Sequence, residues 1–87
     1  MAGFEVVFKQ SVAKDLRRIS TPDIARILSR IRGLASEPRP NGVEKLPGQQ
    51  RYRIRQGAYR IIYEVKDSES LVVVVKVGHR RDVYRSR

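Results

Sequence analysis

Arginines alternate with apolar residues in two strand-like segments of this chain, Tyr52–Arg55 and Tyr59–Tyr63. Because a β-strand points successive side chains to opposite faces, Tyr52 and Ile54 can face a core while the intervening Arg53 and Arg55 line the other face. The pattern therefore predicts a sheet with one apolar face and one basic, solvated face. A basic sheet face of this kind can bind a polyanion.

The expected elements follow the order β-α-α-β-β-β. A first strand is expected at Phe4–Phe8 and a helix at Ser11–Ile19. A second helix is expected to start at Thr21 and to end at the segment Glu37–Gly42. Strands are expected at Gln50–Gln56, Ala58–Lys66 and Leu71–Val77. Short connections make the last three strands antiparallel neighbours, and the apolar run Leu71–Val75 predicts that the last of them is central. The order predicts an α+β sandwich, with a helical hairpin on one face of a mainly antiparallel sheet.

The helix boundaries carry their own signals. Ser11 is expected to cap the first helix, and Thr21 the second, where Pro22 suits the first helical position. The second helix has an apolar stripe at helical spacing, formed by Ile24, Ile27, Leu28, Ile31 and Leu34. The two helices are separated by a very short turn and should form an antiparallel hairpin.

Strict alternation assigns the side chains of the last two strands to faces. On the middle strand, Tyr59, Ile61, Tyr63 and Val65 share one face, opposite Arg60, Ile62, Glu64 and Lys66. On the last strand, alternation groups Val73, Val75 and Val77 against Val72, Val74 and Lys76. The predicted basic face then carries Arg53, Arg55, Arg60 and Lys76, with Arg80 near the exit of the last strand. Glu64 is expected to act as a partial counter-ion.

Length and composition predict one small domain over residues 1–87. The chain has no cysteine, which fits a reducing compartment, and no apolar stretch approaches the roughly 20 residues that span a bilayer. The N-terminus lacks the charged and then apolar layout of a signal peptide. A soluble, cytoplasmic protein is expected.

The formal net charge is +10, and its excess lies in the second half. Residues 39–87 carry 12 basic and 5 acidic side chains, against 7 and 4 in residues 1–38. Arginine holds phosphate through a planar fork of donors, so a nucleic acid or an acidic protein is the expected partner. A solvated basic surface with no such partner is the alternative, and the alternating placement of the arginines favours binding.

Most catalytic chemistries are excluded by the residue inventory. One histidine and no cysteine rule out Cys–His and His–His pairs, the acids are scattered, and no glycine-rich phosphate loop is present. No metal site and no cofactor are therefore expected. Arginine electrostatics with Tyr84 and His79 can still support RNA cleavage by the RNA's own 2′-hydroxyl, which needs orientation, charge stabilisation and proton transfer.

Both candidate proton-transfer residues have structural alternatives. His79 is a candidate acid or base whose usual pKa suits the task, and the alternative is a hydrogen-bonded loop histidine. Tyr84 needs a lowered pKa, which positive neighbours favour. Its alternatives are an apolar ring at the sheet edge or a platform on which a base stacks.

Four segments together resemble the RelE/ParE toxin superfamily of prokaryotic toxin–antitoxin modules: Lys45–Gly48, Tyr52–Arg55, Gly57–Val65 and Val77–Tyr84. The resemblance covers essentially the whole chain. RelE-type members are ribosome-dependent endonucleases that cut mRNA in the A site by a metal-free 2′-hydroxyl mechanism. The resemblance therefore implies an endoribonuclease that inhibits translation.

The resemblance to the RelE branch also implies roles for named residues. RelE-type members have two basic residues at alternate positions of one strand, and these match Arg53 and Arg55. Their arginine in the next strand matches Arg60, their arginine just after the last strand matches Arg80, and their tyrosine near the C-terminus matches Tyr84. The alternating pair is often lysine in that branch, so arginine here shifts the proton-acceptor role towards Tyr84 or His79. Further contacts to RNA or the ribosome are expected from the other basic residues Lys45, Arg51, Lys76 and Arg81.

ParE-type members share the fold and inhibit DNA gyrase, and they generally lack this arginine–tyrosine set. A non-enzymatic gyrase inhibitor and an inactive basic module that binds RNA or peptide are the two alternatives. The family further implies an acidic, RelB-like antitoxin that wraps the toxin. The toxin alone is expected to be monomeric and to form larger assemblies with the antitoxin.

Overall fold

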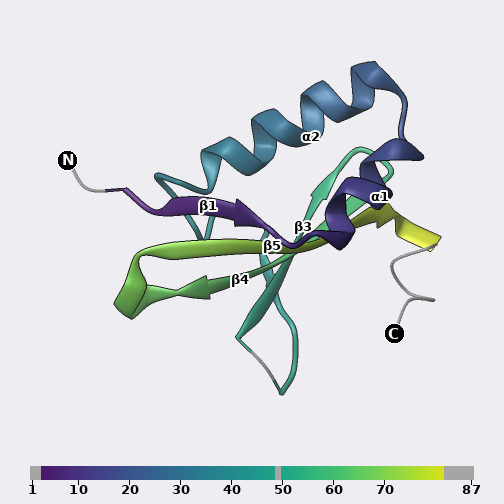
Figure 1. Ribbon diagram of the computed structural model, residues 1–87. Helices are drawn as coiled ribbons and strands as arrows, with labels where there is room; N and C mark the ends of the chain where they lie inside the picture. The colour runs from purple at the N-terminus through teal and green to yellow at the C-terminus, as the bar shows by residue number, and fades with distance from the viewer. Residues whose placement is uncertain (1–2, 49, 82–87) are drawn as a thin grey trace.

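The computed structural model describes residues 3–48 and 50–81. Its elements are the strands β1 (Glu5–Phe8), β2 (Glu44–Lys45), β3 (Arg51–Gln56), β4 (Tyr59–Lys66) and β5 (Leu71–His79), the helices α1 (Ser11–Arg17) and α2 (Thr21–Gly33), and a 3₁₀ turn at Asp67–Glu69. The strands form one sheet in the order β1-β5-β4-β3-β2, in which β1 is parallel to β5 and the other pairs are antiparallel. Both helices lie on one face of this sheet (Figure 1). The predicted α+β architecture is confirmed.

The helices begin one residue away from the predicted caps. Gln10 precedes α1, so Ser11 is already helical, and Ser20 rather than Thr21 holds the extended cap conformation before α2. The Ser20 hydroxyl donates to the Asp23 carboxylate at 3.0 Å. Pro22 lies in the first turn as expected, because its fixed φ suits a helix start.

The core lies between α2 and the sheet. The predicted stripe of α2 is buried at Ile27, Ile31 and Leu34, with Ile24 and Leu28 packed at its margin. The sheet supplies the opposing side chains, namely Tyr52, Ile54, Ile61, Tyr63, Val65, Val72, Val74 and Val77. The apolar face predicted for β3 and β4 is therefore the face that the helices cover.

The faces predicted for β5 are wrong in its first half. Tyr63 pairs with Val74 and Ile62 pairs with Lys76, so Val75 is an extra residue in a β-bulge. The bulge changes the alternation, and Val72, Val74 and Val77 share the helix face. Beyond the bulge, Lys76 still points to the face of Ile62, as predicted.

Two core tyrosines, Tyr52 and Tyr63, form hydrogen bonds with the segment that follows α2. The Tyr63 hydroxyl donates to the carbonyl of Pro38 at 2.6 Å, and the Tyr63 ring stacks on Tyr52 with centroids 5.8 Å apart. Arg39 donates to the Tyr52 hydroxyl and forms a two-pronged ion pair with Asp67, at 3.1 and 2.7 Å. This pair lowers the pKa of Asp67 and raises the pKa of Arg39. These contacts connect the segment that follows α2 to β4 and to the turn between β4 and β5.

Replacing Tyr63 by phenylalanine should change how the fold responds to alkali. Burial raises the pKa of Tyr63 to about 12, so the folded state favours the neutral phenol. This contribution to stability is fully present below the usual tyrosine pKa near 10 and is lost as the pH rises towards about 12. Urea unfolding between these two pH values should show a steeper loss for the wild type than for Tyr63→Phe. Parallel losses would show that Tyr63 does not control alkaline unfolding.

No helix in the described residues is long and apolar enough to cross a membrane.

Candidate functional site

The strand register aligns the predicted basic residues in three rows on the face away from the helices. Side chains directly opposite one another in an antiparallel pair point to the same face. The rows are Arg51–Glu64–Val73, Arg53–Ile62–Lys76 and Arg55–Arg60–Gly78. Arg53, Arg55 and Arg60 therefore lie together on neighbouring strands, and these three residues are called the arginine cluster below.

Arg60 differs from the expectation of an open, solvated face, because it is buried. Only 7% of the residue is exposed, and its Nη1 donates to the carbonyl of Tyr59 at 3.2 Å. The buried Nε has no hydrogen-bond partner in the part of the chain that the structure describes. Arg55, directly opposite on β3, adds a like charge. A buried guanidinium with an unmatched donor is costly, and an anion would satisfy it.

Glu44 is a counter-ion of the cluster that the sequence did not predict. It lies on β2 opposite Arg53, and its Oε1 accepts a hydrogen bond from Arg53 Nε at 3.0 Å. Arg53, and more weakly Arg55 and Arg60, lower the pKa of Glu44. A two-residue strand is too short for a periodic pattern, so no sequence signal identified this residue. Glu44 gives the arginine cluster one fixed negative neighbour at its outer edge.

Two of the residues expected to contact RNA are already paired with carboxylates. Arg51 Nε lies 2.9 Å from Glu64 Oε2, and Lys76 Nζ lies 3.5 Å from Asp15 Oδ1 on α1. Glu64 thus acts as the counter-ion that alternation predicted. These pairs reduce the local charge on either side of the arginine cluster.

The remaining predicted basic residues lie at the two ends of the sheet. Lys45 is exposed and pairs with Tyr52 in register, so it belongs to the helix side of the sheet, away from the arginine cluster. Arg80 and Arg81 are exposed just after β5. The Arg80 N–H donates to the carbonyl of Ala58 at 2.9 Å, which holds Arg80 beside the β3–β4 turn. Arg80 therefore lies at the same end of the sheet as the row of Arg55 and Arg60.

His79 does not join the arginine cluster. It pairs with Tyr59 in register, on the face that carries Ile61 and Val77 towards the helices. The Tyr59 and His79 rings meet edge to face with centroids 5.9 Å apart. The sheet thus separates His79 from Arg60, because residue 78 rather than residue 79 is opposite Arg60. Tyr84, the other candidate base, lies outside the described residues.

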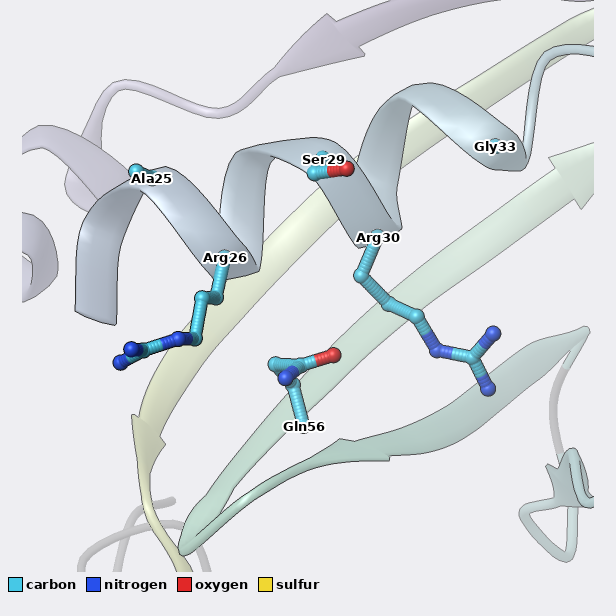
Figure 2. A pocket seen from close by; sticks show the side chains of 6 residues that line it. All are labelled: Ala25, Arg26, Ser29, Arg30, Gly33 and Gln56. Atoms are coloured by element: carbon cyan, nitrogen blue, oxygen red, sulfur yellow. The ribbon is translucent and has the colours of Figure 1, made fainter. Parts of the chain in front are cut away.

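Two adjoining hollows lie on the helix side. The first has a volume of about 520 Å³ and lies between α2 and the end of β3, where Arg26, Arg30 and Gln56 line it (Figure 2). The second, of about 340 Å³, continues under the start of α2 to Tyr59 and His79. Both hollows are lined by Arg26 and Gln56, so they adjoin, and together they are called the α2 groove below. No local sequence pattern predicted this groove, because its lining residues come from four elements, α2, β3, β4 and β5.

No group of three or more histidine, cysteine or acidic side chains in residues 3–48 and 50–81 is arranged to hold a metal ion.

Residues 6–84 match the sequence model of a protein family described as the ParE toxin of type II toxin–antitoxin systems, parDE. The chain belongs to this toxin family. The predicted membership of the RelE/ParE superfamily is confirmed, and the protein is a toxin of the type II toxin–antitoxin class.

Individual relatives of this toxin carry RelE-type names. Toxin RelG of Mycobacterium tuberculosis is 30% identical over 86 residues, which cover 94% of this chain and 97% of the relative. Among solved structures, the RelBE2 toxin–antitoxin complex of M. tuberculosis has a TM-score of 0.80 at 25% identity, covering 92% of this chain and 94% of that one. The archaeal RelE–RelB complex of Pyrococcus horikoshii has a TM-score of 0.79 at 30% identity, covering 88% and 94%.

Proposed function

We propose that this toxin is a ribosome-dependent endoribonuclease that cleaves mRNA in the A site and so inhibits translation. The observation that carries the proposal is Arg60, a buried guanidinium whose Nε lacks a partner among the described residues. Its neighbour in register is a second arginine, Arg55. Two like charges on adjacent strands suit a phosphate group, which accepts hydrogen bonds from several arginine donors at once.

In the proposed reaction, the RNA supplies its own nucleophile. The 2′-hydroxyl attacks the adjacent phosphate, the bond from phosphorus to the 5′-oxygen breaks, and a 2′,3′-cyclic phosphate forms. The 2′-hydroxyl proton goes to a base, and the leaving 5′-oxygen takes up a proton. The protein must orient the strand and stabilise the extra negative charge at phosphorus, and this requires neither a metal nor a cofactor.

The proposed roles follow the positions of the residues. Arg60 and Arg80, at the same end of the sheet, hold the scissile phosphate, while Arg53 and Arg55 orient the RNA. Arginine keeps its proton, with a pKa above about 12, and cannot be the base. Since His79 lies on the other sheet face, we assign the base to Tyr84, with stacking on a nucleobase as its second role. Arg51, Lys76 and Arg81 contribute charge near the RNA, and Lys45 would do so from the helix side.

We further propose an acidic antitoxin as the protein partner. Two of the solved relatives, those of M. tuberculosis and P. horikoshii, are toxin–antitoxin complexes named RelBE2 and RelE–RelB. The net charge of +10 and the arginine cluster suit an acidic chain that competes with RNA. We propose a monomer for the toxin alone, larger assemblies with the antitoxin, and a cytoplasmic location, where ribosomes are.

The second candidate function is inhibition of DNA gyrase without catalysis. The match to a family described as ParE toxins favours it. The arginine cluster favours the ribonuclease, because a protein that only binds gyrase has no need of a buried guanidinium with an unmatched donor. A supercoiling assay separates the two, since a gyrase inhibitor blocks supercoiling and leaves mRNA intact.

Arg80→Ala and Tyr84→Ala are each expected to abolish A-site cleavage while the fold and antitoxin binding persist. Arg80 is exposed, so its truncation removes no core contact. Primer extension on mRNA from translating ribosomes measures the cleavage. Arg32→Ala, an exposed arginine of α2, is the matched control and should cut like the wild type. Unchanged cutting by both variants would refute the proposed function.

A further inference from the structure

The α2 groove combines a basic end with an aromatic end on the side of the sheet opposite the arginine cluster. Arg26 and Arg30 extend from α2 to either side of Gln56, which projects from the end of β3 (Figure 2). The two arginines are four residues apart, so their Cα atoms are separated by one helical turn, roughly 6 Å along the axis.

The charge of the basic end is only partly compensated. Arg26 pairs with Asp23, with Nη1 at 3.3 Å from Oδ1, and 65% of the Arg26 side chain is exposed. Arg30 is half-buried and has no ion pair within the described ranges 3–48 and 50–81. Ser29 on α2 and Gln56 on β3 line the same hollow (Figure 2). This combination of guanidinium, hydroxyl and amide donors suits a phosphodiester backbone.

The aromatic end has the chemistry of a nucleobase pocket. The Tyr59 and His79 rings meet edge to face, and a planar base can stack on either of them. Asp23 lines the same hollow and can accept hydrogen bonds from base N–H groups. Burial and the neighbouring Asp23 carboxylate raise the pKa of Tyr59, so the ring stays neutral at physiological pH.

The net charge is compatible with either RNA or an acidic peptide in this groove, and Asp23 favours RNA. Its carboxylate, 37% exposed, would repel the acidic side chains of a peptide lying in the hollow. A nucleobase instead brings N–H donors to this carboxylate while its phosphates reach Arg26 and Arg30. Single-stranded binding sites elsewhere combine a positive groove with aromatic platforms in this way.

We propose that the α2 groove is a second RNA-binding site, which takes a short single-stranded segment with one base against Tyr59 and His79 and its phosphates at Arg26 and Arg30. The choice of RNA rests on the proposed function. The site itself is separate from the arginine cluster, because the sheet lies between them.

Fluorescence anisotropy with a labelled six-nucleotide single-stranded RNA tests the groove. The full chain carries Arg60→Ala so that the RNA stays intact. In this background, Arg26→Ser with Arg30→Ser should weaken binding at least tenfold and reduce the salt dependence by about two charges, a slope change of about 1.4 for single strands. The control, Arg17→Ser with Arg32→Ser, removes the same charge from exposed positions outside the groove and should have the smaller effect. Equal effects of the two pairs would overturn the proposal.

An abasic probe isolates the aromatic end. Tyr59→Leu should weaken binding of the normal RNA about 5- to 150-fold, the range of base stacking, and leave binding of an abasic strand unchanged. An equal loss for both probes, or a hexaglutamate peptide that displaces the RNA from the groove, would overturn the proposal. Circular dichroism confirms that each variant is folded. Cleavage by the wild type on ribosomes is measured separately. A result against RNA binding in the α2 groove can therefore be distinguished from a result against the proposed ribonuclease activity.

Discussion

Replacing Arg60 by methionine is expected to abolish RNA cleavage and to make the fold more stable. The methionine side chain has a similar length, but it has neither the charge nor the donors that would hold the scissile phosphate. Loss of one preorganised donor to a developing negative charge costs roughly 10²–10³-fold in rate. The same change removes a buried Nε without a partner in the described chain and the repulsion between Arg60 and Arg55. An unsatisfied buried donor costs on the order of 1–3 kcal/mol.

Thermal unfolding and primer extension measure the two effects of Arg60→Met on the same protein. A gain of 1 kcal/mol raises the midpoint by roughly 4–8 °C in a domain of this size. Arg60→Lys is the charge-preserving variant and should keep only a small part of the activity, because lysine lacks the planar fork. Arg32→Met, on the exposed surface of α2, should leave the cleavage rate unchanged. An Arg60→Met protein that still cuts at the wild-type rate would exclude Arg60 from the reaction.

The sequence predicted the architecture well because its periodic signals are strong. The stripe of α2 and the alternation in β3 and β4 each assign several residues to one face, and the structure agrees with these assignments. The two-residue β2 carries no such signal. The parallel pairing of β1 with β5 joins segments more than 60 residues apart, and no local pattern encodes it.

The bulge at Val75 shows why alternation failed on β5. Residues 72 to 75 are all valine. Whichever of these valines face the helices, the buried and the opposite side of the strand carry the same kind of side chain, so the sequence does not show which ones are buried. The extra residue leaves no trace in such a run, whereas β4 alternates polar with apolar residues and fixes its own faces. Only the pairing with β4, which places Val74 opposite Tyr63, resolves the ambiguity.

The sequence predicted which arginines share the candidate site, but it did not predict how buried they are or which side chains contact them. Alternation grouped Arg53, Arg55 and Arg60 on one face, and the register brings them together. Burial of Arg60 and its missing partner depend on how neighbouring side chains pack, which no local pattern reports. His79 follows the last predicted strand, so its face could not be assigned until β5 was seen to continue through it.

Of the substitutions proposed for this protein, Ile27→Ala is expected to lower the free energy of unfolding most. Ile27 is fully buried at the centre of the α2 stripe, where it packs into the core between helix and sheet. Truncation of a buried isoleucine to alanine costs about 2–5 kcal/mol, because it removes apolar contact and leaves a cavity. A domain of this length has a total stability of roughly 4–13 kcal/mol, so the loss is a large fraction of it. Urea unfolding measures the change through the midpoint and the slope.

Ile27→Val is the matched control, because it removes one methylene and should cost about 0.5–1.5 kcal/mol. A loss in Ile27→Ala no larger than in Ile27→Val would show that α2 is held mainly by other contacts, such as those of Tyr63 and Arg39. The arginine cluster lies on strands β3 and β4, on the face that α2 does not cover. Cleavage per folded molecule should therefore stay near the wild-type rate in Ile27→Ala, whereas it is lost in the more stable Arg60→Met. Opposite effects on stability and activity in these two variants would separate the residues that hold the fold from those that act on RNA.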